Sequence, residues 1–196
     1  MKLLNWKRTA LLVAVPAFGL GLAAPAAVAA PVPAAITDAA GDVYDDDDEL
    51  VDAPYADIVS ADGAKSDANL VLTYKTAKAL DPLSDPNWES DNTFTDFILD
   101  TNGDNTADFD VEYGVFEEEL YVDVYKSDAG EEDEPVCSGE AAFAKDAHTA
   151  TVPLSCLGNP RALGYRVEAV YDLDVNNDES LAGYDQAPDE GFAKIG

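Results

Sequence analysis

Residues 107–126 read "ADFDVEYGVFEEELYVDVYK", and apolar and polar residues alternate along both halves of this stretch. The apolar residues that share one face are Phe109, Val111 and Tyr113, followed by Leu120, Val122 and Val124. Alternation with a period of two indicates a β-strand with one face buried, because successive side chains point to opposite faces of a strand. The stretch therefore predicts two half-buried strands in succession.

The same period recurs along most of the chain. Five further segments have it, separated by turns rich in Gly, Asn, Asp and Pro: residues 56–64, 69–77, 94–100, 140–156 and 162–174. Segment 140–156 is long enough for a hairpin that turns near Asp146–His148. No helical period interrupts these segments, so parallel βαβ units are excluded. We predict an all-β fold, an antiparallel β-sandwich of about seven to nine strands.

The first thirty residues have the three parts of a secretory signal. A basic start precedes an apolar run at 11–22, and the small residues Ala27 and Ala29 then match a cleavage pattern with the cut before Ala30. A retained membrane anchor is the alternative, but the apolar run is short and broken by Pro and Gly. We predict a signal peptide at 1–29 and a secreted, extracellular protein.

The next segment, 30–55, is rich in Ala and Pro and then acidic, with five consecutive acids from Asp45 to Glu49. We expect a flexible leader here, because such a composition offers little apolar surface to bury. Residues 56–196 are then expected to form a single β-sandwich domain.

The chain has 40 Asp and Glu residues against 11 Lys and Arg, a formal net charge of −29. This charge excludes nucleic acid as a natural partner and argues against docking on anionic membranes. Bound cations would relieve the self-repulsion of so acidic a chain. Solubility outside the cell, or adaptation to a salty medium, is the alternative explanation. The sequence does not indicate an oligomeric state.

Cys137 and Cys156 are the two cysteines of the chain. In an exported protein such a pair predicts one disulfide, whereas free buried thiols are the alternative. In the chain-entropy description, closing a loop of about 20 residues stabilises the fold by roughly 3 kcal/mol.

An acidic turn after residue 99 has the spacing of a calcium loop. Oxygen ligands stand at the first, third, fifth, seventh and ninth places, and they are Asp100, Asn102, Asp104, the Thr106 carbonyl and Asp108. Two places depart from the pattern, since Asn105 replaces the usual glycine and Val111 replaces the final acid. A completing carboxylate would have to come from Asp110, Glu112 or Asp57. The alternative is an ordinary turn in which Asx side chains cap their own backbone.

A second, weaker run of the same kind consists of Asp174, Asn176, Asp178, Ser180 and Asp185. Glu179 again stands where glycine is usual. Dockerin domains use this spacing, but in two repeats with helices, and one run without a helical pattern is present here. Calcium is thus the predicted cofactor, with an affinity of roughly 10⁻⁴–10⁻³ M, as in extracellular modules.

Several short motifs resemble a known group of domains. They are "TDAAGD" at 37–42, "ADIVSADGA" at 56–64, "NLVLTYKTA" at 69–77, "FILDTNGDNTADF" at 97–109, "CLGNPRALGYRVEAV" at 156–170 and "YDQAPDEGF" at 184–192. In this order they resemble secreted bacterial β-sandwich domains related to DOMON and to the family-nine carbohydrate-binding modules. The resemblance implies a jelly-roll-like, commonly non-catalytic sandwich, with calcium in some members. It also implies, in some members, an extracellular polysaccharide or cell-wall component as partner.

Sugar binding in that group uses paired aromatic residues, and the candidates for stacking here are Trp88, Tyr121 and Tyr125. For Trp88 the favoured alternative is that it fills the end of the core, because it lies in a long loop broken by prolines. The haem-binding branch is disfavoured, since His148 is the sole histidine and Met1 the sole methionine.

No catalytic motif stands out. The chain lacks a G-x-S-x-G sequence, and one histidine cannot form a three-histidine zinc site. We therefore predict that the protein is not an enzyme but a secreted, calcium-stabilised module with a binding or surface role. A carbohydrate-binding, lectin-like module is the alternative, and a secreted hydrolase is the least favoured function.

Overall fold

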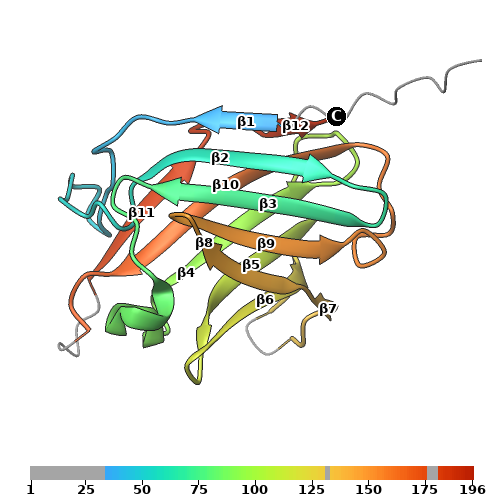
Figure 1. The fold of residues 1–196 in the computed structure, drawn as a ribbon. Helices are drawn as coiled ribbons and strands as arrows, with labels where there is room; N and C mark the ends of the chain where they lie inside the picture. The colour runs from blue at the N-terminus through green and yellow to red at the C-terminus, as the bar shows by residue number, and fades with distance from the viewer. Residues whose placement is uncertain (1–33, 131–132, 176–180) are drawn as a thin grey trace, which may run out of the picture. The chain divides into compact units, whose positions relative to one another are not determined.

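The computed structural model describes residues 34–130, 133–175 and 181–196. In this part of the chain twelve β-strands form two antiparallel sheets, which face each other as a sandwich (Figure 1). The predicted all-β, antiparallel fold is confirmed, whereas the predicted signal peptide at 1–29 lies outside the described residues. No helix in the described ranges is long and apolar enough to cross a bilayer.

The first sheet has five strands in the order β1-β2-β3-β9-β8. Their bounds are β1 Ala34–Thr37, β2 Ile58–Lys65, β3 Asn69–Thr76, β8 Glu140–Ala144 and β9 Ala147–Pro153. Strands β8 and β9 are the predicted hairpin, and its turn residues Lys145 and Asp146 both have positive φ angles. Two such residues are typical of a two-residue hairpin turn that follows the strand twist.

The second sheet has seven strands, with β11-β10-β4-β5-β6-β7 in order and β12 beside β10. Their bounds are β4 Phe94–Asp100, β5 Phe109–Phe116, β6 Glu119–Lys126, β7 Cys137–Ser138, β10 Leu163–Asp172, β11 Ala182–Ala187 and β12 Ala193–Ile195. The alternating residues 109–126 form the β5–β6 hairpin.

The core lies between the sheets and is built from the alternate residues that the period predicted. On β5 and β6 the fully enclosed side chains include Val111, Tyr113, Val122 and Val124. Burying an apolar side chain of this size stabilises a fold by about 1.5–3 kcal/mol. The alternation therefore decides which face of each strand points inward.

The sandwich begins earlier than the sequence indicated. Strand β1 pairs with β2, and Val43 is buried against Gly183 of β11. The backbone of Tyr44 exchanges two hydrogen bonds, of 3.0 and 2.7 Å, with that of Tyr184 on β11. The prediction of a flexible leader is therefore wrong for residues 34–55, because Ile36, Val43 and Ala53 are buried in the core by contacts that no local pattern indicates.

Trp88 fills one end of the core. It lies on a short 3₁₀ helix, η2 (Pro86–Glu89), which follows η1 (Pro82–Ser84), and it is only 4% exposed. Its ring stacks on His148 at 5.4 Å between centroids and meets Tyr113 edge-on. The core-filling alternative is confirmed, and the interpretation of Trp88 as an exposed stacking platform is wrong.

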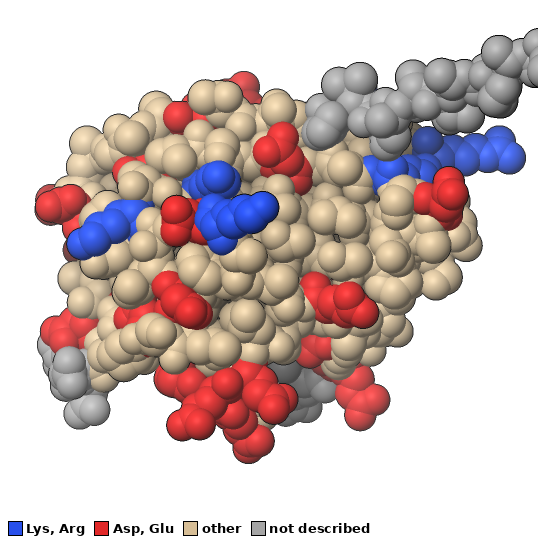
Figure 2. Space-filling model, viewed as in Figure 1, with Lys and Arg blue, Asp and Glu red and all other residues tan. Residues whose placement is uncertain are grey.

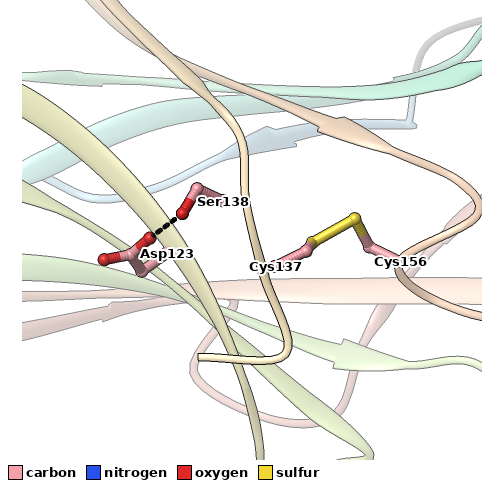
Figure 3. Close-up of a disulfide and its surroundings, with 4 residues drawn as sticks. All are labelled: Asp123, Cys137, Ser138 and Cys156. Carbon is pink, nitrogen blue, oxygen red and sulfur yellow. Dashed lines mark hydrogen bonds between the residues drawn. A yellow bond between two sulfur atoms is a disulfide. The ribbon is translucent and has the colours of Figure 1, made fainter. Parts of the chain in front are cut away.

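The predicted disulfide between Cys137 and Cys156 is confirmed. Cys137 lies on β7 of the seven-stranded sheet, and Cys156 lies in the turn after β9 of the five-stranded sheet. The disulfide therefore links the two sheets (Figure 3). Next to it, within the seven-stranded sheet, the Ser138 hydroxyl donates a 2.6 Å hydrogen bond to Asp123 of β6.

Candidate metal centre

Three carboxylates from distant parts of the chain meet at one end of the sandwich. Each of Asp38, Asp42 and Asp185 offers an oxygen, and these oxygens lie within 4.8 Å of one another. Asp38 and Asp42 belong to the segment that follows β1, and Asp185 belongs to β11. Figure 1 shows this segment beside β11. The Tyr44–Tyr184 pairing holds the two together.

A fourth acid, Asp57, adjoins these three. One of its oxygens accepts a 2.8 Å hydrogen bond from the Gly41 backbone N–H, between Asp38 and Asp42 in the chain. Gly41 has a φ of 88°, a conformation that favours glycine and allows the tight turn from Asp38 to Asp42. Asp185 is held by the backbone N–H groups of Ile58 and Gln186, at 2.6 and 2.8 Å.

Several oxygens of this cluster have no hydrogen-bond partner although they are buried. They are Oδ2 of Asp38, Oδ1 of Asp42 and Oδ1 of Asp57. Asp57 as a whole is only 4% exposed. Among the described residues the one salt bridge joins Arg166 to Glu168, so no basic side chain neutralises the cluster by an ion pair. Buried carboxylate oxygens without partners are costly, and a hard cation is the group that would satisfy several at once.

The electrostatics of the cluster agree with its geometry. Burial, followed by the charges of Asp42 and Asp38, raises the pKa of Asp185 to about 7, against the opposing hydrogen bonds from Ile58 and Gln186. Burial also raises the pKa of Asp38 and of Asp57, and the charge of Asp42 adds to both shifts. The fold therefore holds these carboxylates where they resist ionisation unless positive charge is supplied.

The predicted calcium loop joins β4 to β5, and its side chains cap their own backbone. Asp100 is buried and accepts hydrogen bonds from the backbone N–H groups of Asn102, Gly103 and Asn105. Although burial opposes it, these bonds hold the pKa of Asp100 below its ordinary value. Asn102 and Asp104 accept hydrogen bonds from the backbone N–H groups of Asp104 and Thr106, respectively. Asp108 accepts one from the backbone N–H of Thr101. These contacts are the Asx turns of the alternative interpretation, and calcium at this loop stays a prediction.

The acids proposed to complete that loop have other partners. Asp110 accepts a hydrogen bond from Ser127 and Glu112 accepts one from Tyr121, both on the outer face of the sheet. Asp57 instead adjoins the cluster of Asp38, Asp42 and Asp185 through its hydrogen bond from Gly41. We call the three clustered acids and the adjoining Asp57 the Asp38 centre.

The second predicted calcium run lies only partly within the described residues. Asn176, Asp178 and Ser180 lie outside the described residues, and Asp174 stands just before that gap. Asp185 does lie among candidate ligands, but its neighbours are Asp38 and Asp42. Sequence reasoning missed these two as ligands, and the signal that could have found them is the motif "TDAAGD".

The outer face of the seven-stranded sheet carries a row of four acids, each directly opposite the next across adjacent strands. The row consists of Glu168 on β10, Asp96 on β4, Glu112 on β5 and Asp123 on β6. Burial, followed by the charges of Glu112, Asp110 and Glu168, raises the pKa of Asp96 to about 7. Like charges directly opposite one another destabilise a sheet. Asp96 is therefore a second position where the fold opposes the ionisation of a carboxyl group.

Tyr121 and Tyr125, two of the predicted stacking residues, lie half-buried on this outer face. The ring of Tyr121 covers Gly114, where an added Cβ would lie 2.7 Å from it. Trp88 is enclosed in the core, so the three predicted aromatic residues do not form one platform. Elsewhere on the molecule, Figure 2 shows acidic side chains spread over the visible face and gathered at its lower edge.

The fold and the Asp38 centre together define an antiparallel β-sandwich with a carboxylate cluster suited to a hard cation. Comparison with family models, with curated proteins and with solved structures found no match.

Proposed function

We propose that this protein is a secreted, non-catalytic β-sandwich module that binds one calcium ion at the Asp38 centre and is stabilised by it. The observation that carries the proposal is the convergence of Asp38, Asp42 and Asp185, with Asp57 beside them and three buried oxygens of these acids that lack partners. The signal-like N-terminus and the disulfide support secretion. The motif order that resembles DOMON and family-nine modules supports the class of module.

The donor set favours calcium over other common ions. All four side chains are carboxylates, and neither His nor Cys, which zinc prefers, belongs to the cluster. Calcium accepts six to eight oxygens in flexible geometry, whereas magnesium demands a near-ideal octahedron and retains several waters. A cluster assembled from three chain segments suits the more tolerant ion.

The ion would act as a cross-link. Asp38 and Asp42 flank a turn next to β1, which has only four residues, while Asp57 immediately precedes β2 and Asp185 lies on β11 of the other sheet. A cation shared among them would tie the N-terminal segment to both sheets. It would also offset the burial, and the repulsion from Asp42 and Asp38, that raise the pKa of Asp185 to about 7.

The environment of His148 supports a non-catalytic role. This histidine stacks between aromatic rings, with Tyr74 at 4.5 Å and Trp88 at 5.4 Å, and it is 2% exposed. Burial lowers its pKa to about 3, so at neutral pH it is an uncharged core residue without access to a substrate.

The test is the thermal unfolding of the purified protein in calcium and in EDTA, with magnesium as a control ion. At ten times the dissociation constant, calcium should stabilise the fold by about 1.4 kcal/mol, a rise in Tm of roughly 3–6 °C. Asp42→Asn should abolish the response, and the matched change Asp104→Asn in the β4–β5 loop should preserve it.

An unchanged Tm in calcium would refute the proposal. A response lost in Asp104→Asn and kept in Asp42→Asn would move the ion to the loop that the sequence first indicated.

A further inference from the structure

Two adjoining pockets lie at the outer face of the seven-stranded sheet, over β5 and β6. Their volumes are about 410 and 360 Å³, and Glu112, Phe116 and Tyr121 line both of them. Ligand sites commonly have volumes of about 300–1,000 Å³. Because the pockets share three side chains, we call them together the β5–β6 groove. The groove lies away from the Asp38 centre, whose Asp185 belongs to β11 at the opposite edge of the sheet.

Aromatic side chains form the apolar part of the β5–β6 groove. Phe116, at the end of β5, is 68% exposed, the largest fraction among the exposed large apolar side chains of the described residues. The ring of Tyr121 covers Gly114, and its hydroxyl donates a 2.5 Å hydrogen bond to Glu112. Phe94 adds a third ring in the larger pocket. Since two contacts hold Tyr121 in place, its ring is positioned before a ligand binds, which lowers the cost of binding.

The rim of the β5–β6 groove is acidic. Its carboxylates are Glu89, Asp91, Glu112 and Glu117 in the larger pocket, with Glu119 and Asp123 added in the smaller one. None of the described residues that line either pocket is Lys or Arg. Carboxylates attract cations, and so do the faces of aromatic rings, which carry partial negative charge. The groove therefore favours a cation.

The combination of rings and carboxylates favours an organic cation over a metal ion. A metal ion would contact the carboxylates and leave the exposed ring of Phe116 uncovered. A guanidinium group stacks on aromatic rings and also binds a carboxylate through two hydrogen bonds. Alternate side chains of an extended peptide point to the same side, so one peptide can present basic side chains to both pockets.

We propose that the β5–β6 groove binds an extended basic segment of a partner protein, with an arginine side chain lying against Phe116 and Tyr121 and paired with Glu112. The next basic side chain on the same side of the segment occupies the second pocket. This interaction does not use the calcium ion of the Asp38 centre, so it goes beyond the proposed function and can be tested apart from it.

The test measures the fluorescence anisotropy of labelled synthetic peptides with the purified protein, in EDTA and about 0.15 M salt. A peptide of alternating Arg and Ser should bind, and a matched peptide of alternating Glu and Ser should not. Phe116→Ala should weaken binding about fivefold, in line with the loss of one cation–π contact. Glu112→Gln should weaken it at least about tenfold, because a hydrogen bond between two charged groups is lost.

Two matched variants make similar changes elsewhere on the molecule. Leu50→Ala shortens another exposed apolar side chain, and Asp146→Asn removes an exposed acid from the β8–β9 turn of the other sheet. Both should bind the Arg–Ser peptide as tightly as the wild type. Thermal unfolding of each variant checks its fold, and Phe116→Ala should keep the wild-type Tm because the side chain is exposed.

Failure of the wild type to bind the Arg–Ser peptide would overturn the proposal. Equal weakening by Asp146→Asn and Glu112→Gln would overturn it too, because the acidic surface as a whole would then attract the peptide. An unchanged affinity in a folded Phe116→Ala variant would exclude the aromatic contact. Equal affinity for free arginine amide would replace the peptide partner by a small cation and overturn the proposal in that form.

Discussion

The stability of the metal-free protein should fall as the pH rises, and Asp185 provides the clearest case. Its folded pKa is about 7, raised from an ordinary value of 3.8 that describes the unfolded chain. The folded state therefore binds more protons than the unfolded state between these values. The stabilisation associated with the protonated form is complete below pH 3.8 and is lost as the pH rises through 7.

The magnitude follows from the same two values. For one carboxyl with these pKa values, the free energy of unfolding falls by about 2 to 3 kcal/mol between pH 5 and pH 8. Asp185→Asn removes this dependence. The substitution also lowers the free energy of unfolding by an amount that does not depend on pH. The asparagine side chain has one acceptor oxygen, so it cannot accept the hydrogen bonds from both Ile58 and Gln186. The pH-dependent part of the difference between the two proteins is therefore the quantity that reports on Asp185.

Urea unfolding followed by circular dichroism at pH 5, 6, 7 and 8 in EDTA measures that difference. From pH 5 to pH 8 we expect the free energy of unfolding of the variant to rise by about 2 to 3 kcal/mol relative to that of the wild type. In calcium the gain of the variant should be smaller at pH 8 by about 1.4 kcal/mol, since the ion stabilises only the ionised wild-type centre. A difference that stays constant from pH 5 to pH 8 in EDTA would refute the reasoning.

Three further outcomes can be measured in the same way. Asp96→Asn should raise the free energy of unfolding more at pH 8 than at pH 5, because the folded pKa of Asp96 near 7 makes its ionisation costly. In urea titrations, a difference between variant and wild type that does not widen with pH would contradict this. His148→Phe should reduce the loss of stability in acid. The pKa of His148 is about 3 in the folded protein and 6.5 as its ordinary value, so the wild type loses about 2 kcal/mol of unfolding free energy between neutral pH and pH 5. The same change of stability with pH in both proteins would count against it. Reduction of the Cys137–Cys156 bond should lower the free energy of unfolding by about 3 kcal/mol, measured by calorimetry with and without reductant, and an unaltered Tm would exclude a stabilising link between the sheets.

Much of the fold could be predicted from local sequence. The alternation in residues 107–126 correctly gives the buried face of β5 and β6, because side-chain direction in a strand depends only on position along it. The β8–β9 hairpin and the Cys137–Cys156 bond were predicted for similar reasons, from a turn and from the export context. The acidic loop after β4 was also found, since Asx spacing is a local property.

The contacts on which the proposed function rests are set by residues far apart in the chain. Asp38, Asp57 and Asp185 are carboxylates among many in an acidic sequence, and no local pattern indicates that the three lie together. They become a centre only because Val43 packs on Gly183 and the Tyr44 backbone pairs with Tyr184. The burial of Trp88 beside His148 has the same origin.

The sequence by itself thus determined strands β2–β6 and β8–β10, their inward faces and the disulfide, because each depends on a short-range period or on a single pair of cysteines. Strands β1, β7, β11 and β12 were not predicted. The tertiary structure alone decided which aspartates meet. Convergence and desolvation of charged groups depend on how distant strands pair, and a linear pattern carries no record of that pairing.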